Sequence, residues 1–428
     1  MSDEHTEFVL VTEYFHPDTA STGQLMMDLA VGLRERGLAI SVYTGQPNYH
    51  SGDNERQPRT SFHEGVRIER IRAPQVRQSS LPRRLFNWSV FTIWTFFVLL
   101  FDEAPEDREV IFVSITPLLP IAVSLACWIR GWEYTYVAYD LYPDQATELG
   151  YLKEGGLLDR LWSRLTVASY RRAKHIVSNG PLMSERIQRN ADYRLDADKI
   201  RLIHNWADEE FITPMAKEDN WFCEQHDLTD SFTVLYSGNI GEFHDLKTLV
   251  EASTRFEDED VRFLIIGEGD NKETIVSLAE RYGVRGDSVR FLPYQDWEDL
   301  PYSLTAGDVS VVAVREGFEG VCVSSKLYTA MAAGRPVLVV AQPYDDESKL
   351  VEKFDAGHHV AQGDVDALVD TVRRWRENPA LASRQGENAR AAFEEHFTKD
   401  AAVDEYYRML AGEPSPRRRV APESSGRA

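Results

Sequence analysis

The sequence predicts an α/β protein made of two domains, each a doubly wound parallel sheet. Two observations predict this fold class. Apolar runs of strand length alternate with helical patterns along the chain, which is typical of parallel sheets. The alternation is interrupted by a polar connection and restarts at Phe232–Ser237. In addition, 428 residues are too many for a single core, so two domains are expected.

The expected domain boundaries follow from composition. The first domain takes residues 1–205, and the polar connection at 206–230 is expected to be a linker. The second domain takes residues 231–395, and a C-terminal helix at 396–411 follows it. Residues 412–428 are rich in proline, serine and arginine and are predicted to form a disordered tail.

Net charge and cysteine usage limit the class of protein. The formal net charge of −22 argues against general nucleic-acid binding. Acids outnumber bases, and arginine outnumbers lysine, a balance that suggests the hypothesis of a halophile-like acidic surface. Cys127, Cys223 and Cys322 form no CxxC spacing, so neither a zinc site nor a disulfide framework is indicated. The acidic start of the chain is unlike a signal peptide, so we expect a cytoplasmic protein.

The first domain begins with a strand at residues 8–12, a loop, and a helix from about 24 to 36. Leu25, Leu29 and Leu33 give this helix an apolar face, and a second strand follows at 39–44. Thr22 and Gly23 are expected at the strand-to-helix turn. Backbone N–H groups there would face a ligand at the carboxyl edge of the sheet, although any such turn can contain a glycine.

An apolar run at residues 85–101 follows a basic stretch. The run is at the short limit of a membrane span, which needs about 20 residues. Two interpretations stay open, a buried helix of the first domain or a helix lying in a membrane interface. Trp88, Trp94 and the basic stretch favour peripheral contact with a membrane. The arginines of this stretch, the Arg59–Arg84 patch, are Arg59, Arg67, Arg70, Arg72, Arg77, Arg83 and Arg84.

A strand at about 134–140 delivers Asp140 to its carboxyl end, where active sites of parallel sheets form. A helix cap or a loop salt bridge is the alternative role for this carboxylate. In the second domain, strands at 232–237, 261–266, 289–292 and 309–314 each end in a loop of Gly, Pro, Glu or Ser. Such loops share one edge of a sheet and can surround a nucleotide-like ligand.

Residues 316–340 read as an acidic loop, a short helix and a buried strand. Ser324 and Ser325 are suitable helix caps, and Gly334 with Pro336 ends the helix. Lys326 opposes the helix dipole in the first turn, which indicates an anionic partner. The alternative is an ordinary crossover with a surface lysine. Asp364-Val-Asp366 has an acid-x-acid spacing, but it opens a helix and is expected to cap it, so no metal site is predicted.

Several motifs together resemble the GT-B glycosyltransferases, in particular the retaining family 4 and its bacterial-type members that use lipid-linked acceptors. The resemblance covers residues 7–410. It is carried by the order and spacing of Glu13-Tyr-Phe-His-Pro with Thr22-Gly23, Asp140-Leu-Tyr-Pro-Asp, Asn205-Trp-Ala-Asp, Gly238-Asn-Ile-Gly, Gly267-Glu-Gly, and Ser325-Lys-Leu-Tyr with Ala332-Ala-Gly-Arg-Pro-Val.

The resemblance implies two Rossmann-like domains facing across a cleft. The second domain would bind a nucleotide-diphosphate sugar as co-substrate, without cofactor or metal. The first would bind the acceptor, through the Thr22–Gly23 loop and a catalytic Asp140. The implied donor residues are Gly238, Gly241, Gly267 and Gly269 for close backbone approach, Leu292 and Pro293 beside the base, and Arg315, Ser324, Ser325 and Lys326 for the diphosphate.

The sequence departs from this family at a pair of glutamates separated by seven residues. Alignment on the Ala-Met-Ala-Ala-Gly run places Val321 and Thr329 at these two positions. We infer that Glu319 takes the sugar-contacting, catalytic role through a shifted loop and that Thr329 holds the ribose. The departure also leaves open that activity is lost or altered.

The leading hypothesis is a glycosyltransferase that moves a sugar onto a polyprenyl-linked glycan at the cytoplasmic membrane face. This reaction would serve the assembly of surface polysaccharide or protein glycans. Two rivals stay open. A sugar-nucleotide epimerase would share the architecture but would need no membrane-facing segment. A non-catalytic sugar-nucleotide-binding partner of another transferase would fit the missing glutamate.

Overall fold

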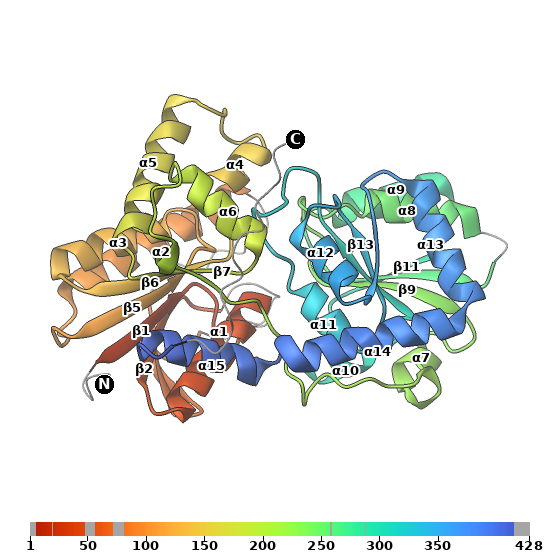
Figure 1. Cartoon of the computed structure of the whole chain (residues 1–428), viewed down its shortest axis with the longest axis horizontal. Helices are drawn as coiled ribbons and strands as arrows, with labels where there is room; N and C mark the ends of the chain where they lie inside the picture. Colours follow the sequence, from red (N-terminus) through yellow and green to blue (C-terminus); the bar gives the residue numbers. More distant parts are fainter. Residues whose placement is uncertain are drawn as a thin grey trace.

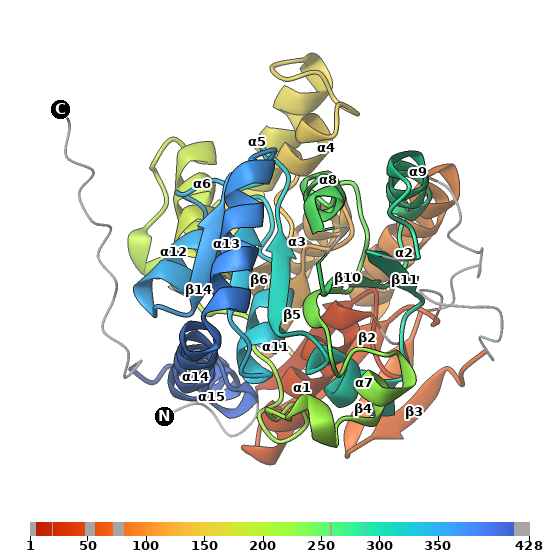
Figure 2. The ribbon, with the colours of Figure 1, turned by 90° about the vertical axis from the view of Figure 1, so that its right-hand side faces the viewer.

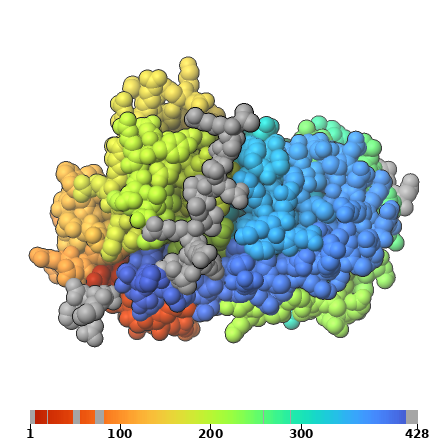
Figure 3. All heavy atoms as spheres, in the orientation of Figure 1, coloured from red at the N-terminus to blue at the C-terminus, as the bar shows by residue number. Residues whose placement is uncertain are grey.

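The computed structural model describes residues 6–18, 20–47, 56–71, 81–256, 259–286 and 288–414. Two α/β domains lie side by side along the long axis of the molecule (Figures 1 and 3). The first contains an eight-stranded sheet and the second a six-stranded sheet, and all strand pairs are parallel except one at the edge of the first sheet. The predicted fold class of two parallel-sheet domains is therefore confirmed.

The first sheet has the order β3-β4-β2-β1-β5-β6-β7-β8. Its buried strands are rich in Val, Ile and Phe, as strands covered on both faces require. The strands are β1 (Glu7–Thr12), β2 (Ala39–Thr44), β3 (Thr60–His63), β4 (Val66–Arg70), β5 (Arg108–Val113), β6 (Glu133–Ala138), β7 (His175–Ser178) and β8 (Ile200–Leu202). The helices are α1 (Ser21–Glu35), α2 (Leu81–Phe101), α3 (Leu119–Arg130), α4 (Asp144–Glu148), α5 (Leu157–Arg172), α6 (Pro181–Asn190) and the 3₁₀ helix η1 (Ala197–Lys199).

The second sheet has the order β11-β10-β9-β12-β13-β14. Its strands are β9 (Phe232–Ser237), β10 (Val261–Ile266), β11 (Val289–Leu292), β12 (Val309–Ala313), β13 (Val337–Val340) and β14 (Gly357–Val360). The remaining α-helices are α7 (Trp221–Gln225), α8 (Lys247–Ser253), α9 (Lys272–Tyr282), α10 (Leu300–Leu304), α11 (Lys326–Ala332), α12 (Asp346–Lys353), α13 (Val365–Glu377), α14 (Pro379–His396) and α15 (Lys399–Leu410). Three short 3₁₀ helices complete the set: η2 (Lys217–Asp219), η3 (Thr254–Phe256) and η4 (Trp297–Asp299).

Helix α1 begins at Ser21, earlier than the predicted start near residue 24. Thr22 and Gly23 therefore lie in its first turn instead of in the preceding loop. Gly23 is buried, and a Cβ added there would lie 3.3 Å from the backbone of Tyr14. Its small size lets the helix pack closely on the loop after β1.

The last helix returns to the first domain. Figure 1 shows α14 and α15 nearly end to end along one edge of the molecule, spanning both domains. Val403 and Tyr406 of α15 belong to the same hydrophobic cluster as Leu29 and Leu33 of α1. A Cβ at Gly32 would approach Val403 Cγ1 to 2.7 Å, so α1 and α15 are in close contact. Of the predicted tail at 412–428, residues 415–428 lie outside the described residues.

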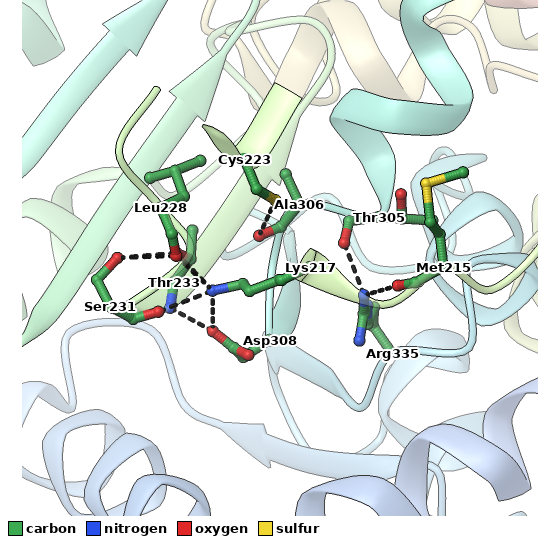
Figure 4. A network of polar contacts seen from close by, with 10 residues as sticks. All are labelled: Met215, Lys217, Cys223, Leu228, Ser231, Thr233, Thr305, Ala306, Asp308 and Arg335. Carbon is green, nitrogen blue, oxygen red and sulfur yellow. Dashed lines mark hydrogen bonds and ion pairs between the residues drawn. The ribbon is translucent and has the colours of Figure 1, made fainter. Parts of the chain in front are cut away.

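The predicted linker at 206–230 begins at Trp206, which packs on α1, and its later part, with η2 and α7, packs against the second domain. Its anchor is Lys217, a buried residue whose Nζ donates to Leu228 O at 3.1 Å, Ser231 O at 2.7 Å and Asp308 Oδ2 at 2.5 Å (Figure 4). The paired ammonium group offsets the cost of burying its charge. These contacts hold this part of the segment against the start of β9.

Helix α2 buries several polar side chains together with Phe91 and Leu99, and it exposes several large apolar side chains. Asn87, Thr92 and Thr95 are buried, although a helix on a soluble core normally turns its polar side chains to water. Only 28% of the apolar stretch Pro82–Phe101 is buried, and by length and composition it could cross a membrane. The exposed large apolar side chains of this helix are Leu85, Phe86, Ile93, Trp94, Phe97 and Phe101.

The Arg59–Arg84 patch is not a single free basic surface in the part that the structure describes. Arg59 and Arg67 of the β3–β4 hairpin region both pair with Glu69. Arg70 is buried, and its Nη2 donates to His16 O at 2.8 Å. Nearness in sequence suggested a patch, but the hairpin turns these side chains toward different partners. Two other members lie outside the described residues: Arg72 and Arg77.

Candidate active site

A cavity of about 730 Å³ lies between the two domains and is lined by both. The carboxyl ends of parallel strands meet here, the usual position of ligand sites in such sheets. The predicted site residues that line it are Thr22, Asp140, Gly241, Gly269, Ser324, Ser325 and Lys326. The predicted site residues outside the lining are Gly23, Gly238, Gly267, Leu292, Pro293, Arg315, Glu319 and Thr329.

Lys326 begins α11 and lies on the second-domain side of the cavity. Its Nζ is 3.1 Å from Nε2 of His244, which follows the loop after β9, and 5.4 Å from the centroid of the Tyr236 ring. Burial lowers the pKa of Lys326 from its usual value to about 8. Burial also lowers the pKa of His244 well below its ordinary value, so its ring is neutral at pH 7.

The glycines of the second domain make room for this lysine and for one another. A Cβ at Gly238, whose φ is +133°, would lie 2.5 Å from Lys326 Cε. A Cβ at Gly267 would lie 1.9 Å from Gly238 O. These two glycines thus support the floor of the site by letting adjacent strand ends meet, whereas Gly241 and Gly269 line the cavity itself.

The two serines before α11 differ in their contacts. Ser324 donates its backbone N–H to Glu347 Oε1 at 2.7 Å, and its buried Oγ has no hydrogen-bond partner in the described part of the chain. Ser325 Oγ lies 2.9 Å from Ser21 Oγ at the start of α1, so the two domains touch across the cavity. Thr329, one turn later, donates its hydroxyl to Lys326 O.

Asp140 lies just beyond β6, on the first-domain side of the cavity. Burial raises the pKa of its carboxyl group to about 7. The neighbouring N–H of Leu141 donates to Val321 O at 3.0 Å, which joins this strand end to the loop before α11. Asp140 therefore shares the cavity with Lys326 and can change its charge near neutral pH.

Glu319 is buried, and its carboxylate has partners within its own domain. One oxygen accepts from the Gly317 N–H at 2.8 Å and the other from Gln362 Nε2 at 3.2 Å. Arg186 of α6 donates to the carbonyl oxygen of Glu319 at 2.8 Å. In this structure Glu319 thus braces the loop at 316–323, and its contact with a sugar stays a prediction.

Arg315, Leu292 and Pro293 also lie outside the lining. Arg315 donates its backbone N–H to Phe243 O and a guanidinium N–H to Glu242 O at 3.3 Å, so it holds the loop after β9. Their proposed contacts with a nucleotide remain predictions, as does that of Thr329.

Sequence reasoning missed several residues of the cavity. His244 follows a glycine loop after a strand, a position that could have been noted. The α2 face was recognised only as apolar, although Arg84, Trp88 and Thr92 of this helix line the cavity. Trp162 of α5 also lines it and had no local motif to mark it.

No group of three or more His, Cys, Asp or Glu side chains that could hold a metal ion occurs within residues that the structure describes.

Two family models match the chain in succession. Residues 22–206 match the glycosyl transferase 4-like domain, and residues 218–392 match the glycosyl transferases group 1 model. The division between the two matches falls in the segment that Lys217 anchors.

Related proteins are also glycosyltransferases. The chain is 26% identical over 370 residues to the putative colanic acid biosynthesis glycosyl transferase WcaI of Escherichia coli K12, covering 84% of this chain and 89% of that one. It is 24% identical over 289 residues to the probable glycosyltransferase WbjE of Pseudomonas aeruginosa, covering 66% and 70%.

Solved structures support the same architecture. Sucrose-phosphate synthase from Thermosynechococcus elongatus superposes with a TM-score of 0.74 at 19% identity, over 95% of this chain and 100% of that one. Anabaena Alr3699/HepE, solved in complex with UDP-glucose, gives 0.69 at 15% identity over the same shares. With two sheets facing across a lined cavity and both family models matched in order, the chain is a glycosyltransferase of the GT-B fold.

Proposed function

We propose that the enzyme transfers a sugar from a nucleotide-diphosphate sugar to a lipid-linked acceptor, with retention at the anomeric carbon, at the cytoplasmic face of a membrane. The donor part of this proposal rests on the position of Lys326, whose partly buried amine lies in the interdomain cavity beside Ser324 and opposite Asp140. A partly buried ammonium group and the unpartnered Ser324 hydroxyl are groups that a diphosphate would satisfy.

The neighbouring proteins support a nucleotide-sugar donor. HepE, which has the same fold, is solved with UDP-glucose, and WcaI is named for colanic acid biosynthesis. In the transfer, the bond from the sugar to the diphosphate breaks and a bond to an acceptor hydroxyl forms. Lys326 would stabilise the negative charge that develops on the departing diphosphate. Asp140 would accept a hydrogen bond from the acceptor hydroxyl, whose proton is released with the reaction.

The exposed apolar face of α2 supports a lipid-linked acceptor. Leu85, Leu118 and Tyr151 each line the cavity and are about half exposed, so the apolar outer face continues into the site. A lipid chain could follow this path without crossing water. Such a contiguous apolar surface at the mouth of a cavity is typical of a membrane or lipid contact.

The apolar outer face extends over three helices. Figures 1 and 2 show the α4–α5 segment projecting from the first domain. Arg172 of α5 lies over the Trp128 ring of α3 at 5.5 Å. Helices α2, α3 and α5 carry seven arginines and one aspartate, against a net charge of −22 for the chain, so this surface would attract anionic lipid. Its exposed side chains beyond α2 are Leu125, Trp128, Ile129, Leu157, Leu158, Leu161 and Leu165.

The test is a transfer assay with a panel of UDP-, GDP- and dTDP-sugars. Each is mixed with purified enzyme and a membrane fraction containing lipid-linked glycans, and products are identified by mass spectrometry. Calorimetry of the same donors, at a salt concentration where the protein is folded, measures binding separately. Donor binding that is lost in Lys326→Gln and a product that stays with the lipid fraction support the proposal. Binding of none of the donors would refute it.

A further inference from the structure

The first-domain wall of the cavity carries polar atoms that the chain itself leaves without partners. Arg84 Nε, Thr92 Oγ1 and Trp162 Nε1 are buried and have no hydrogen-bond partner among the described residues. All three residues line the cavity, on α2 and α5. Buried donors are normally satisfied, so three on one wall of one cavity indicate groups that a ligand would meet.

Arg84 is held by an ion pair that crosses the cavity. Its Nη1 lies 2.6 Å from Asp270 Oδ2, which follows Gly269 in the donor domain. The side chains of Arg84 and Asp270 are 27% and 46% exposed, so the pair is partly hydrated and of low strength. Asp270 uses Nη1, whereas Nε–H lies on the opposite edge of the guanidinium group, beside Nη2. That Nε–Nη2 edge suits a two-oxygen anion, whose negative charge would repel the Asp270 carboxylate from the same guanidinium group.

The surroundings of Arg84 are apolar on one side. Trp88, Leu149 and Leu152 line the same cavity, and Trp162 stacks on Tyr142 with ring centroids 5.9 Å apart and planes within 4°. This stacking fixes the indole ring. An anion bound at Arg84 would therefore lie between a polar cleft and an apolar passage that opens at the exposed face of α2.

We propose that Arg84 is the anchor of an acceptor subsite and binds the phosphate of a prenyl-phosphate-linked acceptor in exchange for Asp270, with Trp162 Nε1 as a second donor. The inference rests on the proposed function, because it assigns the part of the acceptor that this cavity holds. Asp270 acts as a placeholder that keeps the guanidinium group in position until the acceptor phosphate displaces it. Lys326 and Arg84 thus serve two different phosphate groups.

The test measures binding of farnesyl diphosphate to the full-length protein by calorimetry. Farnesol and inorganic pyrophosphate are measured separately, because they represent the apolar part and the anionic part of this probe. Arg84→Gln is expected to weaken farnesyl diphosphate binding about tenfold or more, since a charge-assisted contact is lost. Asp270→Asn is expected to strengthen it several-fold, because the competing carboxylate is gone. Arg83→Gln, a change at the exposed neighbour outside the cavity lining, is the matched control and is expected to leave binding unchanged.

Two further readouts keep this inference separate from the donor proposal. Binding of UDP and GDP is measured on every variant, and donor binding retained in Arg84→Gln shows that the variant is folded. If the wild-type protein binds no donor nucleotide, the donor proposal is refuted. The farnesyl diphosphate measurements still test the Arg84 subsite in that case. Farnesol binding is expected to be weak and independent of Arg84.

Three outcomes would overturn the inference. If Arg84→Gln and Asp270→Asn weaken farnesyl diphosphate binding equally, the pair is only a structural latch between the domains. If binding depends on Lys326→Gln and not on Arg84→Gln, the probe has bound in the donor subsite. If vesicles of phosphatidylglycerol bind the wild type and Arg84→Gln equally and farnesyl diphosphate adds no competition, the anion recognised is a bulk lipid headgroup at the surface.

Discussion

Nζ of Lys326 lies 3.1 Å from Nε2 of His244, and Nδ1 of the same ring accepts the N–H of Gly241 at 3.3 Å. Because the ring is neutral and Nδ1 is an acceptor, the ring proton is on Nε2. Nε2–H can then donate to Lys326 only when the lysine is an uncharged amine. This contact therefore disfavours the ammonium ion, in agreement with the lowered pKa of the lysine. Above about pH 8, a bound diphosphate would restore the charge.

This relationship predicts how donor binding depends on pH. The pKa of Lys326 is lowered to about 8, so the side chain is an ammonium ion below that pH and an amine above it. Affinity for the donor nucleotide is expected to be constant up to about pH 8 and to fall by up to about tenfold per pH unit above it. Calorimetry at pH 9 in two buffers of different ionisation enthalpy should show uptake of one proton. Lys326→Arg, which stays charged, should show a flat profile, and a flat wild-type profile would contradict the prediction.

Gly238→Ala is predicted to displace Lys326. The new Cβ would lie 2.5 Å from Lys326 Cε, so the lysine side chain must move away from its place beside His244. Donor affinity is expected to fall about tenfold or more. The matched control is Gly286→Ala, also at positive φ but with no atom within 4 Å of the added Cβ. Gly286→Ala imposes the same kind of backbone strain without displacing Lys326. Equal losses of donor affinity in the two variants would therefore contradict the displacement of Lys326 as the cause.

Asp140→Asn is predicted to abolish transfer while preserving donor binding. The pKa of Asp140 is raised to about 7, so the carboxylate forms as pH rises through 7. The wild-type kcat/KM is expected to rise through pH 7 and to fall above about pH 8, where Lys326 loses its charge. Glu13→Gln is the control, because burial also raises the pKa of Glu13 to about 7 but its side chain lies outside the cavity lining. This variant should keep the rise near pH 7.

Asp140→Asn is also predicted to change how the stability of the protein depends on pH. A carboxyl group whose folded pKa is raised contributes stability below its unfolded pKa, and that contribution is lost as pH rises through 7. Asp140→Asn cannot ionise, so its Tm is expected to exceed that of the wild type at pH 8.5 by more than it does at pH 5.5. An inactive variant with a raised Tm would exclude misfolding as the cause of its inactivity.

Charged substitutions on the outer face of α2 are predicted to release the protein from membranes. Trp94→Asp or Phe97→Asp places a carboxylate on the exposed apolar surface and should reduce sedimentation with phosphatidylglycerol vesicles several-fold. Binding of the donor nucleotide in solution should not change. Phe62→Asp, on the edge strand β3, is the control, because Phe62 is 70% exposed and Trp94 and Phe97 are each 47% exposed; it should bind vesicles as the wild type does. Loss of transfer to lipid without loss of vesicle binding would contradict the surface assignment.

The order of strands and helices was readable from the sequence because each strand is a compact apolar run bounded by turn residues. Asp140, Ser324, Ser325 and Lys326 were placed in the cavity by the same logic, since strand ends converge at one edge of a sheet. The inward polar face of α2 was not readable. The spacing of Thr92 and Thr95 places both on one face of the helix, but spacing alone does not say whether that face is turned to the core.

Pairings between domains also lay beyond the sequence. Arg84 and Asp270 belong to separate domains, and only the packing of the two domains brings them within 2.6 Å. The return of α15 to α1 was missed for the same reason. Local composition predicts a helix at 396–411 but carries no information on which distant apolar face covers it.

Glu319 provides the sharpest test of the sequence-based assignment. Its two carboxylate oxygens accept hydrogen bonds from the Gly317 N–H and from Gln362 Nε2. If Glu319 only holds the loop, Glu319→Gln should keep the loop in place, because the amide oxygen can still accept from Gly317. In that case Glu319→Gln should change donor affinity and kcat by less than about threefold. Gln362→Glu should reduce both by more, because it places two carboxylates next to each other. A role in contact with the sugar instead predicts loss of kcat in Glu319→Gln with nucleotide affinity retained. Measuring kcat beside the affinity for the nucleotide without sugar therefore decides between the two, because only sugar contact separates them.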